Sequence, residues 1–235
     1  MDWMERLTLF SNTDAVAVAL LLTAWIVIGL LVENPPQSYP SVSVLMAQYR
    51  REWMVQMVSR EPRIFDAQIL SSLRQGTAFF ASATMIAIGG CLALLGNMER
   101  FMGVASDLTL ENDPIIVWEV KILVLLIFLT NAFLKFVWSN RLFGYCAVLM
   151  SAVPNDPAHP KALPRARKAG EINITAAKGF NRGLRSTYFA LTTAVWLLGP
   201  EALIGAVIFT CLVLLRREFA SHSRAVLMLA EDTET

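Results

Sequence analysis

Three polar residues that could do chemistry inside a membrane interrupt one strongly apolar stretch of the sequence. Lys121, Asn131 and Lys135 lie within residues 118–141, which hold the longest strongly apolar run of the chain. Successive residues of a helix are rotated by about 100°, so the three side chains fall within an arc of about 80°. The spacing therefore predicts a narrow polar seam, formed by these three residues, on an otherwise apolar helix.

Two interpretations of this polar seam are open. In one, Lys121 and Lys135 reach toward opposite membrane surfaces, and the Asn131 amide bonds a neighbouring helix. In the other, the seam faces a pore, a solute path or a partner helix, because polar residues inside a membrane are costly unless they serve a function. Two lysines in such a path would favour anions.

The motifs of common enzyme classes are missing from the sequence. It contains no phosphate-binding loop, no dinucleotide fingerprint and no His-Glu-x-x-His zinc motif. No Asp or Glu lies deep within an apolar run, although membrane hydrolases and proton pumps need buried carboxylates or histidines. The three cysteines and two histidines lack the spacing of metal ligands. We therefore expect no catalytic residue, no cofactor and no metal site, in a protein that is not an enzyme.

Two polar motifs beside the apolar runs could contribute to an enzyme, but anchoring of helix ends explains them better. One surrounds Arg60 and the other begins at Asn181. Both lie where helices are expected to pass into the membrane, and arginines anchor helices at such places. The residues expected to contact the cytoplasmic membrane surface or a partner are Arg60, Arg63, Asp66, Arg141, Asn181, Arg182 and Arg185.

The composition is that of a helical membrane protein. Of 235 residues, 55% are hydrophobic and 17% are charged, whereas about a quarter of the residues of a soluble domain are charged. The apolar residues form long runs, which predict an all-α bundle of membrane helices in a single domain covering residues 1–235. The net charge of +1 gives no indication of nucleic-acid binding.

Five apolar segments are candidates for membrane crossings. We expect crossings at residues 14–32, 76–97, 117–138, 184–198 and 202–215. The first follows an acidic flank and is too long for the core of a signal peptide, so we expect it to be retained. The cytoplasmic connections 33–75 and 139–183 are rich in Arg and Lys. Each contains an amphipathic helix suited to a membrane surface or to packing on the bundle.

The last apolar region is divided at Gly199, Pro200 and Glu201. It could form one kinked helix or a hairpin of two short crossings, because proline and glycine both interrupt a helix. Cationic connections belong in the cytoplasm, and only a hairpin places every Arg- and Lys-rich segment on one side. We therefore predict five crossings in a multi-pass protein of the bacterial inner (plasma) membrane, with the N-terminus outside and the C-terminus in the cytoplasm.

Small residues recur along one face of the segment 76–97. They are Ala78, Ser82, Gly89, Ala93 and Gly96. Small side chains at such a spacing let the backbone of another helix approach closely. We expect this face to pack within the bundle or against a second copy of the chain.

Several separated patches of the sequence resemble one family. They are residues 50–73, 78–84, 135–141 with Tyr145, and 181–185 with Tyr188, Phe189, Trp196 and Gly199-Pro200. In this order they resemble a bacterial and plant membrane family catalogued as a domain of unknown function, number 599. The resemblance covers most of the chain from residue 33 onward. It implies an integral membrane protein of four or five helices and brings no assigned activity, so it assigns no functional residue.

Two functions are compatible with these features, and the first of them, a channel or transport component, is preferred because polar residues inside a membrane are costly to keep without a use. The polar seam and the small-residue face favour an oligomeric channel or transport component. The missing catalytic chemistry and the two basic cytoplasmic helices favour a non-catalytic accessory or assembly protein of a membrane complex, able to bind anionic lipid or an acidic partner. In both cases we expect the partners to be the lipid bilayer and either further copies of the chain or another membrane protein.

Overall fold

Long helices build the whole of the described chain. The computed structural model describes residues 9–98, 103 and 114–229, and every element within them is helical. The elements are α2 (Asn12–Glu33), α3 (Val42–Gln56), η1 (Met57–Ser59), α4 (Ile64–Leu95), α6 (Ile115–Ser151), α7 (Ala162–Ala194), η2 (Val195–Leu198), α8 (Pro200–Phe219) and α9 (His222–Leu227). The predicted all-α class is confirmed.

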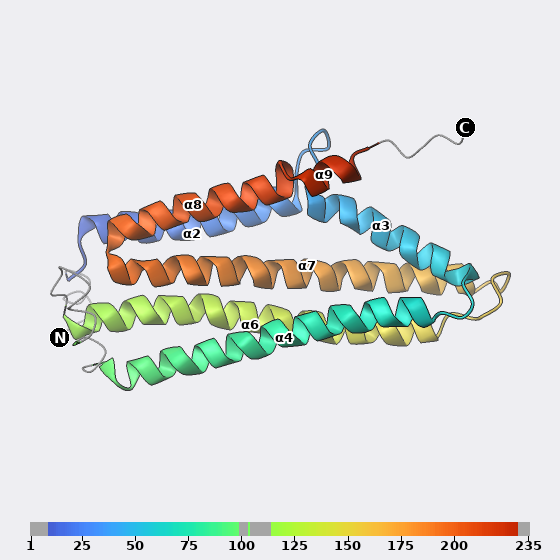
Figure 1. Ribbon diagram of the computed structural model, residues 1–235, viewed down its shortest axis with the longest axis horizontal. Helices are drawn as coiled ribbons and strands as arrows, with labels where there is room; N and C mark the ends of the chain where they lie inside the picture. The colour runs from blue at the N-terminus through green and yellow to red at the C-terminus, as the bar shows by residue number, and fades with distance from the viewer. Residues whose placement is uncertain (1–8, 99–102, 104–113, 230–235) are drawn as a thin grey trace.

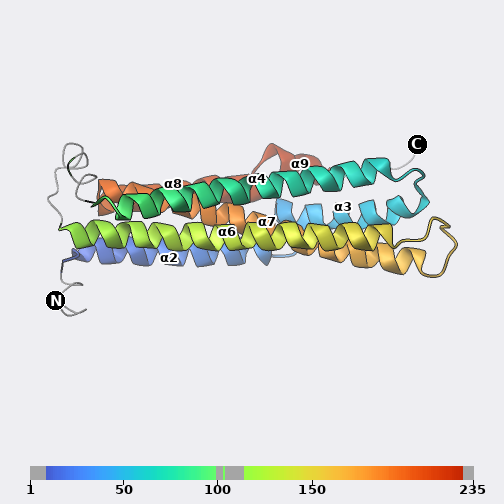
Figure 2. The same ribbon diagram turned by 90° about the horizontal axis from the view of Figure 1, so that it is seen from below.

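The bundle is elongated and has two different halves. Figure 1 shows α4, α6 and α7 running along nearly its whole length. Helices α2 and α8 pack on one half, and α3 packs on the other, as the turned view in Figure 2 also shows. We refer to the half that contains α2 and α8 as the apolar half, and to the half that contains α3 as the α3 half.

Three helices are long and apolar enough to cross a membrane, namely α2, α4 and α6. They make the chain a candidate membrane protein by length and composition. Helices α7 and α8, which contain the predicted crossings 184–198 and 202–215, do not meet the same measure. The prediction of five crossings is therefore not confirmed.

The chain reverses direction at Gly199, so the region 184–215 is a hairpin and not one kinked helix. Gly199 has a φ of 116°, which glycine adopts more readily than any residue with a side chain. Pro200 follows as the first residue of α8, where its missing N–H costs no hydrogen bond. The hydroxyls of Thr192 and Thr210 lie 2.7 Å apart, which ties the two antiparallel helices together (Figure 1).

The long helices extend past the ends of the predicted crossings. Helix α6 has 37 residues and is about 55 Å long at about 1.5 Å per residue, whereas the apolar core of a bilayer is about 30 Å thick. The predicted crossing 117–138 continues without a break to Ser151. The second amphipathic helix, expected inside 139–183, is the first part of α7 and continues into the last apolar region. Neither helix breaks at the predicted membrane boundary, because no proline lies at that point in α6 or in α7.

Close packing of α6 on α7 organises the bundle, and small residues of α7 make it possible. A Cβ on Gly179 would lie 3.4 Å from the Cβ of Ser139, and a Cβ on Gly183 would lie 2.6 Å from the ring of Phe136. The small-residue face of α4 behaves differently, because Ala78, Ser82, Gly89, Ala93 and Gly96 are all exposed. Packing of that face inside the bundle is therefore not found.

Cations are distributed unevenly between the two halves. Lys121 lies near the start of α6, and α6 begins at the end of the bundle where α7 is followed by α8 (Figure 1). The other Lys and Arg residues of the described chain belong to parts of the chain near or beyond the level at which α2 ends. The helix start at Asn12 and the turn at Gly199 lie at the same end. This asymmetry is the pattern from which the membrane orientation is predicted.

Candidate functional site: a cationic groove between α2, α6 and α7

The polar seam is divided into two separate groups, and Lys121 forms the first. Its side chain is 2% exposed, and its ammonium lies 5.3 Å from the centre of the Trp118 ring and 5.8 Å from that of Trp196. The indole of Trp196 also donates a hydrogen bond of 2.7 Å to Asp14 of α2. Lys121 is therefore enclosed between helices and does not extend to the surface.

Asn131 and Lys135 form the second group, beginning about 15 Å further along α6. The amide of Asn131 donates a hydrogen bond of 2.5 Å to the hydroxyl of Ser186 in α7. Lys135 is half-buried one turn further along. Asn131 thus bonds a neighbouring helix, as the first interpretation of the seam expects.

An aromatic layer separates the two polar groups. The ring of Phe128 stacks on Phe189 with 6.3 Å between the centroids, and Trp25 meets Phe128 edge-on at 5.4 Å. Phe128 and Phe189 are both buried. In this conformation the layer lies between the environment of Lys121 and that of Asn131, so the seam does not form one continuous polar surface.

The second polar group lines a groove of about 310 Å³ between α2, α6 and α7. Helix α7 lies between α2 and α6 (Figure 1), and these two pack more extensively on other helices than on each other. The groove is apolar along α2 and polar where α2 ends. The lining residues are Trp25, Ile26, Gly29, Leu30, Glu33, Asn131, Lys135, Arg182, Arg185 and Ser186.

The charges of this groove do not balance. Glu33, the last residue of α2, accepts hydrogen bonds from both Arg182 and Arg185. The Arg185 side chain is 8% exposed and that of Arg182 is 47% exposed. Lys135 forms no ion pair within the described part of the chain. Three cations and one carboxylate give the lining a formal charge of +2, although Glu218 of α8 also acts on Arg185 from outside the groove.

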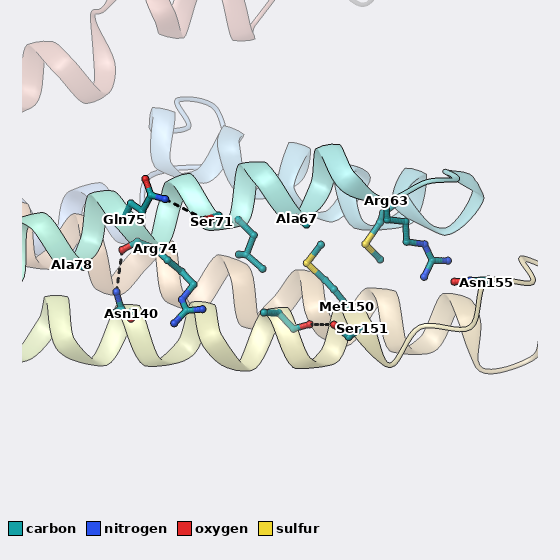
Figure 3. Close-up of a pocket in the computed structure, with 13 residues that line it drawn as sticks. Arg63, Ala67, Ser71, Arg74, Gln75, Ala78, Asn140, Met150, Ser151 and Asn155 are labelled. Atoms are coloured by element: carbon teal, nitrogen blue, oxygen red, sulfur yellow. Dashed lines mark hydrogen bonds between the residues drawn. The ribbon is translucent and has the colours of Figure 1, made fainter.

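A second groove, of about 580 Å³, lies in the α3 half between α4 and α6 (Figure 3). Arg63 donates to the backbone carbonyls of Val58, Val153 and Pro154 at 2.8–3.2 Å. Arg74 extends from α4 toward α6. These two arginines are the charged residues of its lining, which contains no carboxylate.

The motif around Arg60 is a local structural contact. Asp66 is fully buried and accepts hydrogen bonds from the indole of Trp53, at 2.6 Å, and from Arg60. Both hydrogen bonds go to Oδ1 and hold the start of α4 against α3, whereas the buried Oδ2 has no hydrogen-bond partner in the described part of the chain. Arg60 and Asp66 are therefore positioned for structure, whereas Arg63 of the same motif lines the α4–α6 groove.

The other predicted surface residues are dispersed. Arg141 is exposed and donates to the hydroxyl of Tyr145 at 2.6 Å. The amide of Asn181 donates to the hydroxyl of Ser43 in α3 at 3.4 Å. Neither residue lines either of the two grooves. In the described part of the chain, no group of three His, Cys, Asp or Glu side chains could hold a metal ion.

The sequence comparison assigns the family. Residues 16–223 match the family described as "Protein of unknown function, DUF599". The chain belongs to the DUF599 family. Comparisons with curated proteins and with solved structures found no match. The patches that carry the resemblance to DUF599 proteins contain the three cations of the groove between α2, α6 and α7, which are Lys135, Arg182 and Arg185.

Two residues that line this groove in the DUF599 chain, Glu33 and Ser186, were not predicted from the sequence as site residues. Glu33 is noted there only as the end of an apolar run, and Ser186 has no distinguishing pattern around it. Their partners are 149 residues or more away for Glu33 and 55 residues away for Ser186. A carboxylate that ends one apolar run and two arginines beside the start of another were the available signal.

Proposed function

We propose that this DUF599 protein is a non-catalytic accessory protein of a membrane complex. Its apolar half holds it in the membrane, and the α4–α6 groove of its α3 half docks an acidic segment of a partner. The observation that carries the proposal is the lining of that groove, in which Arg63 and Arg74 are not matched by any carboxylate. Its second support is the length of α4, α6 and α7, which takes the α3 half beyond the thickness of a bilayer core.

Five crossings are part of the proposal. Large apolar side chains face outward on α8 and on the second part of α7, as they do on the three candidate crossings, and those on α7 and α8 include Leu191, Ile208, Phe209 and Leu212. A lipid environment would cover them, because unpaired apolar patches of this extent are costly in water. The cationic α3 half then lies in the cytoplasm, with the N-terminus outside.

The shape of the α4–α6 groove favours an extended or helical peptide. Arg63 is held in place by three neutral carbonyls, so its charge is fixed in position and is not neutralised by an anion. Arg74 follows about 16 Å further along α4, and Leu70, Ala147 and Met150 provide apolar contacts within the same groove. A partner with two carboxylates about five extended residues apart, and apolar residues between them, matches this arrangement.

The test is native mass spectrometry of the protein extracted from its own membranes in mild detergent. We expect a stoichiometric complex with a different protein, which Arg74→Glu dissociates. The matched control is Lys161→Glu, which reverses an exposed charge outside the groove and should leave the complex intact. A chain that is always recovered without another protein, or a complex that survives Arg74→Glu, would contradict the proposal.

A transport role is the second candidate, because polar groups lie on both sides of the aromatic layer in the apolar half. Movement of Trp25 and Phe128 would be needed to join the environment of Lys121 to the groove at Lys135, as in pores that are gated by apolar constrictions. The corresponding assay is anion flux into liposomes that contain the purified protein. This role predicts a flux that Lys135→Ala changes, together with a discrete ring of identical subunits in the mass spectrum. An inactive wild type would rule it out.

A further inference from the structure

We propose that the groove between α2, α6 and α7 binds one phospholipid with an anionic headgroup, independently of any protein partner. The headgroup phosphate lies among Lys135, Arg182 and Arg185, and an acyl chain lies along the apolar wall of α2.

The order of residues along the groove is the order of groups in a phospholipid. At the level where α2 ends, the lining consists of Glu33, Lys135 and Arg182. About one helical turn deeper are Arg185, Asn131 and Ser186, and the last two bond each other. Deeper still, α2 contributes Ile26 and Trp25, and the edge of the Trp25 ring rests on Phe128. The groove therefore changes from cationic to apolar in the direction of the membrane centre.

Charge favours an anion at the outer end. Glu33 is shared by two guanidinium groups, so Arg182 and Arg185 have more N–H donors than one carboxylate can accept. Lys135 adds a third cation with no ion-pair partner in the described part of the chain. Phosphate oxygens accept several charge-assisted hydrogen bonds at once, and basic pockets between membrane helices are suited to anionic lipid headgroups.

Space favours a chain along α2. A Cβ placed on Gly29 meets no atom within 4 Å, although Gly29 lies in the lining beside Trp25 and Ile26. Helix α7 closes the groove from one side, and α2 and α6 leave it open between them. A lipid could therefore enter the groove sideways from the bilayer. A soluble phosphate compound would need no such lateral opening.

The test measures how lipids of defined headgroup bind the purified full chain. Phosphatidylglycerol, phosphatidylcholine or inorganic phosphate is titrated into the protein in mild detergent, and binding is followed by native mass spectrometry. We expect wild type to retain phosphatidylglycerol in preference to phosphatidylcholine. One cation near an anionic headgroup is worth about fivefold in affinity, so Lys135→Ala should weaken phosphatidylglycerol binding about fivefold. Arg141→Ala removes an exposed cation of the same helix outside the groove and should leave the preference unchanged.

A second pair of variants tests the apolar part. Gly29→Phe fills the groove without meeting protein atoms at its Cβ and should abolish the retained lipid, whereas Gly29→Ala leaves room for the chain. Equal retention of both lipids by wild type, or equal losses in Lys135→Ala and Arg141→Ala, would overturn the proposal. Binding of inorganic phosphate that is as tight as that of the lipid would assign the site to a free anion, which would also overturn it. Loss of a protein complex in Arg74→Glu does not affect these measurements, so the two proposals fail separately.

Discussion

Gly183 lies directly against the ring of Phe136 where α7 packs on α6, and replacing it with alanine is the sharpest test of this packing. A Cβ at this position would lie 2.6, 2.8 and 3.0 Å from three ring carbons of Phe136. The ring is fully buried and is held between Phe80 and Phe180, whose centroids are 5.5 and 5.6 Å away. The ring therefore has little room to move, and the helices must separate to accept the methyl group.

The expected size follows from two opposing effects. Overpacking a tight core costs about 1–3 kcal/mol, and the short distances at Gly183 place the variant in the upper part of that range. Replacing glycine by alanine within a helix contributes about 1 kcal/mol in the other direction. The net loss in the free energy of unfolding is about 1–2 kcal/mol, which corresponds to a Tm lower by about 2–8 °C in a chain of this size.

The assay is thermal unfolding in mild detergent, with two comparisons. Gly144→Ala lies in the same bundle, and its Cβ meets no atom within 4 Å, so its Tm should rise by about 2–4 °C. Adding Phe136→Leu to Gly183→Ala should recover part of the loss, because the shorter side chain makes space for the methyl group. A Gly183→Ala protein that is as stable as Gly144→Ala would show that α6 and α7 do not approach this closely.

Three further predictions concern polar groups, each tested by thermal unfolding in mild detergent. Glu33→Gln leaves Arg185 buried without its ion-pair partner and should cost about 3 kcal/mol. Asp66→Asn weakens the two hydrogen bonds of a fully buried carboxylate and should cost about 1–3 kcal/mol. The hydrogen bond from Arg51 lowers the pKa of Glu171 below its ordinary value. This exposed ion pair therefore stabilises the fold above a pH of about 4.3, the ordinary pKa of a glutamate. Because both side chains are exposed, the stabilisation is less than about 1 kcal/mol. That stabilisation is lost as the pH falls through the lowered pKa, and the Tm difference between wild type and Glu171→Gln should disappear with it. A wild-type Tm after any of these replacements at neutral pH would contradict the contact concerned.

The apolar runs of the sequence predicted the helical class and the positions of α2, α4 and α6, because long unbroken runs of apolar residues have few other structures available to them. Gly199 and Pro200 are visible as a break, and charge asymmetry favoured a hairpin there. The ends of α6 and α7 were harder to predict. Asn140 and Arg141 have the composition of a membrane boundary, but a change in polarity does not by itself end a helix, and α6 continues through Gly144 to Ser151.

The groove could be predicted only in part. Lys135, Arg182 and Arg185 were each noticeable as cations near the ends of apolar runs. Glu33, the common partner of Arg182 and Arg185, comes from the far end of the sequence. The rotation per residue predicts that Lys121 and Lys135 lie on similar sides of α6. It cannot show that Phe128, Phe189 and Trp25 separate them, because that layer is assembled from three different helices.

Both proposals require α4, α6 and α7 to leave the membrane near the level of Lys135, and labelling of two cysteines on α6 tests this requirement directly. Ile127 is 66% exposed in the apolar half and Val148 is 69% exposed in the α3 half, so the two positions differ in depth and not in packing. In a chain without its native cysteines, carried in sealed membranes, Val148→Cys should react with a membrane-impermeant maleimide applied from the cytoplasmic side. Ile127→Cys should react only after denaturation. Protection of both positions would place the α3 half within the membrane, and labelling of both would show that the apolar half does not cross it.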